Sequence, residues 1–202
     1  MSAFTAFLET GFRHIWSAQA TDHLTFLLAL CAPFVLADWR RVVALVTSFT
    51  IGHSLTLALA TLGVVAVNKQ VIEYLIPVTI ILTALVNMMQ AGRAEARPSR
   101  RPAPVVWAAP NALALAFGLI HGLGFANMLS SLLTSSRELP LTLLAFNLGV
   151  ELGQLLAVSI ILLLGFVVLR GFRAARRDWV LTTSSAAIGV ATLLLVQMAN
   201  GK

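Results

Sequence analysis

Charged residues are scarce in this sequence, and their scarcity excludes an ordinary soluble domain. Only 11% of the 202 residues are charged, whereas a soluble domain carries about a quarter. Hydrophobic residues make up 58% of the chain, and the mean hydropathy is +0.89. Apolar runs long enough to cross a bilayer recur along the whole length. The composition therefore predicts one integral membrane domain over residues 1–202, with the lipid bilayer as its surroundings.

Cysteine is almost absent as well. The one cysteine, Cys31, lies in an apolar run, so a disulfide framework is excluded. The lack of paired thiols also argues against a copper(I) or iron–sulfur site. The sequence pI is about 11.1, but the basic residues sit between apolar runs. We interpret them as topology signals and expect no nucleic-acid partner.

The apolar runs predict an all-α transmembrane bundle of about six spans, preceded by a short interfacial N-terminal helix. Residues 1–17 are the mixed segment that we place at the outer face, and residues 91–108 are the one long polar loop. The six predicted spans are Thr21–Ala37, Val42–Val67, Val71–Gln90, Ala109–Leu132, Leu141–Leu169 and Trp179–Met198.

Arginines orient the predicted bundle. Ten of the 14 basic residues follow the first, third and fifth spans, which six crossings would place on one side. The positive-inside rule makes that side cytoplasmic, so that loop 91–108 is cytoplasmic and both termini lie outside. We expect a multi-pass protein of the inner, cytoplasmic membrane.

Histidines stand inside the apolar runs. His53 and His121 lie about midway along the second and fourth spans, and His23 follows Asp22 at the outer end of the first. Glu151 in the fifth span is the one acidic residue deep in any span. A buried carboxylate needs a partner or solvation, and imidazoles with carboxylates bind borderline divalent ions such as nickel, cobalt or zinc.

This pattern predicts one intramembrane metal site. Its predicted ligands are Asp22, His23, His53, His121 and Glu151. Asn147 and Gln154 share a helical face with Glu151, and Thr50 and Ser54 lie on one stripe of the second span. These four polar side chains are predicted to support the ligands by hydrogen bonds. His14 is an extra ligand if its segment folds back over the site.

Simpler interpretations remain open for each residue. A single histidine in a membrane helix often only bonds a neighbouring helix, Asp22 is suited to begin a helix, and His14 is compatible with a plain interfacial position. Gly118 and Gly122 flank His121 at the spacing that lets helices approach closely, which requires no ion.

Four motifs resemble the HupE/UreJ family in sequence order: "TDHLTFLLAL", "SFTIGHSLTLALA", "FGLIHGLGFA" and "FNLGVELGQL". The resemblance implies a small membrane permease for nickel or cobalt that accompanies the maturation of hydrogenase or urease. It assigns the family's metal motifs to Asp22 and His23, to His121 with Gly122, and to Glu151. Seven residues separate His14 from Asp22 here, where the family usually has five, and the later motif lacks a second histidine.

Two classes of function are therefore predicted. The first is a nickel or cobalt permease that uses the histidine and carboxylate site. The second is an intramembrane zinc enzyme acting on a lipid or lipoprotein, although no GxSxG or HExxH motif supports it. A protein that donates metal to a maturation partner is a further alternative, and a homo-oligomer is compatible with each.

Overall fold

Every secondary-structure element among the described residues is a helix, which confirms the predicted all-α class. The computed structural model describes residues 2–17, 20–65, 68–94, 109–132 and 139–201, and no strand occurs within these ranges. The helices are α1 (Ala3–Trp16), α2 (Thr21–Cys31), α3 (Trp39–Thr61), α4 (Lys69–Ala94), α5 (Ala109–Leu132), α6 (Leu139–Phe166) and α7 (Arg176–Ala199). A 3-10 turn η2 (Leu36–Asp38) precedes α3, and a π-helical turn η4 (Val167–Gly171) extends α6.

The lengths of these helices fit a membrane protein. Within the described residues, four stretches are long and apolar enough to cross a bilayer: Leu36–Thr61, Lys69–Ala91, Leu139–Gly171 and Arg176–Ala199. The apolar helices Thr21–Cys31 and Ala109–Phe125 are shorter. Each predicted span thus has a helix at its position, while the number of crossings stays a prediction. Most of the predicted loop 91–108 lies outside the described residues.

Large apolar side chains cover the outside of the bundle. Along α6, Leu148, Leu152, Leu156 and Leu163 are all more than 40% exposed, whereas Gln154 on another face of the same helix is fully buried. A helix that is apolar outward and polar inward is suited to a lipid surround. This exposure and the apolar spans identify a membrane protein.

Glycines bring α3 and α5 into close contact. A Cβ atom at Gly118 would collide with the carbonyl oxygen of Phe49, and one at Gly122 would collide with that of His53. The two helices run in the same direction, because rising residue numbers on α5 meet rising numbers on α3. The glycines beside His121 therefore fix the distance between the two helices that carry His53 and His121.

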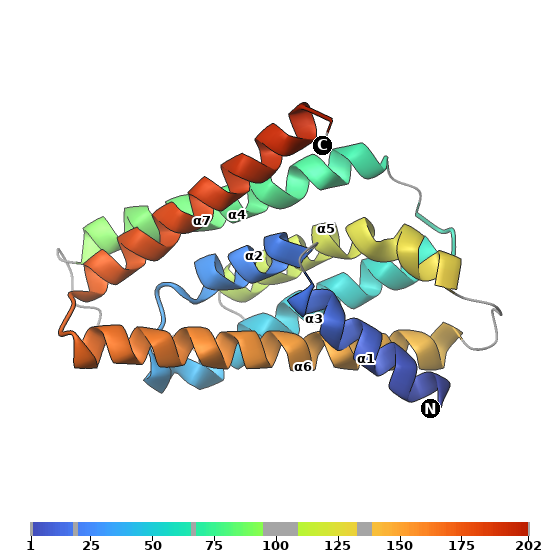
Figure 1. Ribbon diagram of the computed structural model, residues 1–202, viewed down its shortest axis with the longest axis horizontal. Helices are drawn as coiled ribbons and strands as arrows, with labels where there is room; N and C mark the ends of the chain where they lie inside the picture. The colour runs from blue at the N-terminus through green and yellow to red at the C-terminus, as the bar shows by residue number, and fades with distance from the viewer. Residues whose placement is uncertain (1, 18–19, 66–67, 95–108, 133–138, 202) are drawn as a thin grey trace.

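The N-terminal helix α1 packs along the first half of α6. Gly11 lies against the backbone of Phe146, and Gly149 lies against the backbone of Leu8. The last residue of α1, Trp16, donates its indole N–H to the carbonyl of Gly153 at 3.3 Å. In Figure 1, α1 runs from one end of the bundle to its middle, and α2 continues from the middle toward the other end. The interfacial placement of residues 1–17 stays a prediction.

Arginine-bearing turns gather at one end of the bundle. Arg176 at the start of α7 donates to the carbonyl of Pro33, which follows α2, at 2.6 Å. Asn87 near the end of α4 donates to the carbonyl of Ala29 in α2 at 2.6 Å. The turn before α3 also lies at this end (Figure 1). This arrangement agrees with the predicted clustering of basic loops, and the sidedness of the membrane stays a prediction.

Candidate metal centre

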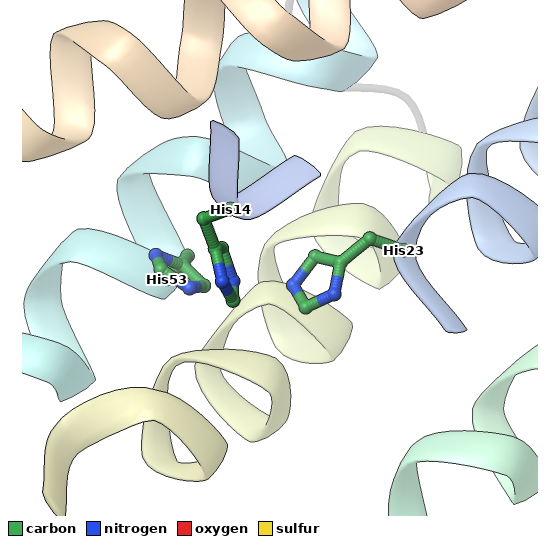
Figure 2. A group of neighbouring side chains, drawn as sticks. All are labelled: His14, His23 and His53. Carbon is green, nitrogen blue, oxygen red and sulfur yellow. The ribbon is translucent and has the colours of Figure 1, made fainter. Parts of the chain in front are cut away.

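Three histidines from three helices meet in the middle of the bundle (Figure 2). His14 comes from the last turn of α1, His23 from the first turn of α2 and His53 from the middle of α3. One ring nitrogen from each lies within 4.8 Å of the others. The ring centroids of His14 and His23 are 4.8 Å apart, and that of His53 lies 6.4 Å from His14 and 6.2 Å from His23. We call this set the three-histidine group.

A second set shares His23. Ligand atoms of Asp22, His23 and His121 also lie within 4.8 Å of one another. The ring of His121, from α5, stands edge-on to that of His23, with the centroids 5.2 Å apart. We call this set the aspartate group. The sequence predicted one site, whereas the structure presents two overlapping sets of ligands.

The imidazole nitrogens of both groups are largely unpartnered. Five buried ring nitrogens form no hydrogen bond within the described residues: His14 Nε2, His23 Nε2, both nitrogens of His53, and His121 Nδ1. Buried polar atoms are nearly always hydrogen-bonded, so each exception needs an explanation. A neutral imidazole carries one lone pair, so each of the four rings offers one nitrogen to a divalent cation, and imidazole nitrogen is a preferred ligand of nickel, cobalt and zinc. The donor set therefore fits a metal ion.

Asp22 orients the ring of His23. Its Oδ1 accepts from the backbone N–H of His23 at 2.8 Å and lies 3.0 Å from the ring Nδ1. An ionised carboxylate only accepts hydrogen bonds, so Nδ1 carries the proton and Nε2 carries the lone pair. A carboxylate behind a histidine is the usual device for directing its other nitrogen at a metal.

Thr79 of α4 holds His121 in the same manner. Its hydroxyl lies 3.1 Å from His121 Nε2 and donates its one hydrogen to the carbonyl of Ile76 at 2.7 Å. Nε2 must therefore be the donor to Thr79, which leaves the lone pair on Nδ1. The sequence analysis missed Thr79. The signal was available, because Thr79 and Thr83 repeat at helical spacing in an apolar span.

Glu151 lies outside both groups. It accepts a hydrogen bond from Thr47 of α3 at 2.9 Å. One turn away, the Thr50 hydroxyl donates to Gln154 at 2.8 Å, and the amide nitrogen of Gln154 has no partner among the described residues. These two pairs link α3 and α6 between the three-histidine group and the N-terminal end of α3.

The other predicted supporting residues bond mainly to their own helices. Ser54 donates to the carbonyl of Thr50 at 2.7 Å. Asn147 donates to the carbonyl of Leu143 at 2.8 Å, approaches His53, and leaves its Oδ1 without a partner within the described residues.

A cavity of about 590 Å³ leads to the histidines. Its lining includes His14, Asp22, His23 and His121, but not His53, which has no exposed surface. The lining also includes Arg13, whose side chain is 78% exposed, so the cavity reaches the surface. The other lining residues come from the second half of α1, the first half of α4, the second half of α5 and the last turns of α7. The start of α4 and the end of α7 lie at the end opposite the arginine-bearing turns (Figure 1).

Comparison with known proteins gives one match. A family model described as "HupE / UreJ protein" matches residues 1–198, which is nearly the whole chain. No curated protein and no solved structure matches the chain.

Proposed function

Because the chain belongs to the HupE/UreJ family, we propose that it is a permease that carries a divalent transition-metal ion, nickel or cobalt, across the cytoplasmic membrane. The observation that carries this proposal is the gathering of four histidines, each with an unpartnered buried ring nitrogen, of which three line an open cavity. The family implies metal handling, and the donor set is suited to such an ion.

The metal ion is the substrate in this proposal, so its ligands should be exchangeable. Each group offers three ligands, which leaves coordination positions for water. No nucleotide-binding motif occurs in the sequence. We therefore propose that the membrane potential drives uptake. An inside-negative potential of 100 mV favours entrance of a divalent ion by about 4.6 kcal/mol if the ion crosses the full field.

We propose six crossings, with α1 and α2 sharing the first, in place of the interfacial position expected for residues 1–17. The 11 residues of α2 span only about 16 Å as a helix, which is about half the hydrocarbon thickness. Since α1 precedes α2 in the same direction and packs along α6 (Figure 1), the two helices together reach across the bilayer. The break between them then falls beside His14 and His23, as in the interrupted helices of other transporters.

One observation favours a second candidate. Three imidazoles beside an accessible cavity are also the ligand set of a catalytic zinc site. An intramembrane zinc enzyme would hold its metal tightly and exchange it slowly, whereas a permease must release it.

Uptake of radioactive nickel and cobalt into proteoliposomes separates the two functions. We expect the wild-type protein to take up metal and His121→Ala to lose uptake. The control is Ser184→Ala, which changes a buried side chain of α7 outside both groups and should leave uptake unchanged. If the wild type takes up no metal but holds about one metal ion tightly per chain, the zinc enzyme becomes the favoured function in place of the permease.

A further inference from the structure

The two ligand groups share one residue, His23, and its ring stands between them. His14 and His53 belong only to the three-histidine group, and Asp22 and His121 belong only to the aspartate group. Figure 2 shows one nitrogen of the His23 ring facing His14 and His53 while the other points away from them. The nitrogen on the far side is Nδ1, which is 3.0 Å from Asp22. Asp22 therefore faces one nitrogen of the His23 ring, and His14 and His53 face the other.

A neutral imidazole has only one lone pair at a time. One ring nitrogen accepts or ligates while the other carries a hydrogen. When Nδ1–H donates to Asp22, as in this structure, the lone pair is on Nε2 and serves the three-histidine group. An ion bound by Nδ1 instead requires the hydrogen on Nε2. His23 can thus complete one group or the other, but not both.

Burial sets an order for the two groups. All three members of the aspartate group line the open cavity, and the Asp22 side chain is 21% exposed. In the three-histidine group, His53 is fully buried and does not line the cavity. An ion that arrives through the cavity meets Asp22 before it can reach His53.

We propose that these groups are two successive stations for one ion, and that the ion passes between them by exchanging Nδ1 of His23 for Nε2. In this exchange the ring loses a proton from Nε2 and gains one at Nδ1. Water in the cavity takes up the first proton and supplies the second, so the charge of the ring is unchanged. Asp22 is a ligand at the first station and the hydrogen-bond acceptor of Nδ1–H at the second. This inference rests on the proposed function, because it assigns the first steps of the metal's path.

Cobalt(II) binding to the purified full-length protein tests this exchange. The visible absorption of the ion reports the number and kind of its ligands. Three variants are compared with the wild type: His53→Gln, His121→Gln and His23→Gln. Ser184→Ala is the control, and the elution profile in size-exclusion chromatography checks that each variant is folded.

We expect the wild type to bind one cobalt per chain. His53→Gln and His121→Gln should each still bind one cobalt, with different spectra, because each variant keeps one station. His23→Gln should lose binding at least tenfold, since it disables both. His53→Gln and His121→Gln should both stop uptake into proteoliposomes.

Three results would overturn the inference. Two cobalt ions per wild-type chain would show that the stations fill together. Loss of all binding in folded His53→Gln or His121→Gln would show a single composite site. Full cobalt binding by folded His23→Gln would show that His23 is not a ligand shared by the two groups. Failure of the permease itself has a separate signature, which is absence of uptake by the wild type whatever the binding spectra show.

Discussion

Gly122 lies so close to the carbonyl of His53 that a Cβ atom would not fit between them. This contact fixes α5 against α3 one residue after His121. The packing of the two helices therefore also sets the distance between His53 and His121. Gly118, one turn earlier, makes the equivalent contact with the carbonyl of Phe49. The glycine pair is therefore part of the construction of the site.

Gly118→Ala should destabilise the bundle and weaken metal binding together. The added methyl group must push the α3 backbone away, and overpacking of this kind costs about 1–3 kcal/mol. The measurement is thermal unfolding followed by a thiol-reactive dye, because the one cysteine, Cys31, is buried. Cobalt binding is measured on the same samples.

The matched control for this prediction is Gly189→Ala in α7, where no atom lies within 4 Å of the added Cβ. This change should leave the unfolding temperature equal or slightly higher, since alanine favours helix. Equal unfolding temperatures for the two variants would show that the α3–α5 contact is not tight.

Asp22→Asn should weaken metal binding by about 10- to 100-fold, the usual effect of removing a partner that orients a histidine ligand. Asparagine keeps the size of the side chain but removes the negative charge beside His23 Nδ1. The measurement is isothermal titration with nickel. Asp38→Asn is the control, because Asp38 accepts from the backbone N–H of Val35 in the connection between α2 and α3, away from the histidines. If Asp22→Asn binds nickel with the same affinity as the wild type, Asp22 takes no part in metal binding.

The sequence predicted the positions of the helices well, because a membrane span is recognised by length and composition alone. The predicted span Ala109–Leu132 has the same bounds as α5, and Leu141–Leu169 differs from α6 by two or three residues at each end. The sequence could not predict which helices pair. Core and lipid-facing residues are both apolar in a membrane protein, so the pattern along α3 does not tell which face meets α5.

The candidate site was also predictable in part, because membrane spans are recognised by their apolar composition and polar residues within them stand out. His23, His53 and His121 stand out from apolar runs, and a polar residue in such a run usually has a role. The position of His14 depended on where α1 ends relative to α6, which only tertiary contacts determine. The division of the ligands into two groups depended on the direction of each ring nitrogen, which is set by Asp22 and by Thr79 on another helix.

Thr79→Val should weaken metal binding to the aspartate group by about tenfold. Valine has nearly the same shape, so the change removes the hydroxyl that accepts from His121 Nε2 and frees the ring to rotate. The measurement is cobalt binding in the His53→Gln background, where only the aspartate group remains. Thr83→Val is a matched control one turn along α4, because its hydroxyl donates to the carbonyl of Thr79 and contacts no histidine. Equal losses from both variants would point to a general effect on α4.

Glu151→Gln should separate binding from transport. Glu151 belongs to neither group and bonds to Thr47, so cobalt binding should stay within about twofold of the wild type. Uptake into proteoliposomes should fall sharply, because Thr47 lies nearly two turns from His53 toward the arginine-bearing end. A carboxylate there would attract the cation after it leaves the three-histidine group.

The control for Glu151→Gln is Glu9→Gln, which removes a surface ion pair with Arg13 and should leave binding and uptake unchanged. Loss of binding in folded Glu151→Gln would instead make Glu151 a ligand, as the family resemblance implies. In that case the side chain must leave Thr47 when the ion arrives, and Thr47→Val should then raise the affinity for metal. Retained binding with normal uptake would place the route to the cytoplasm along a different helix.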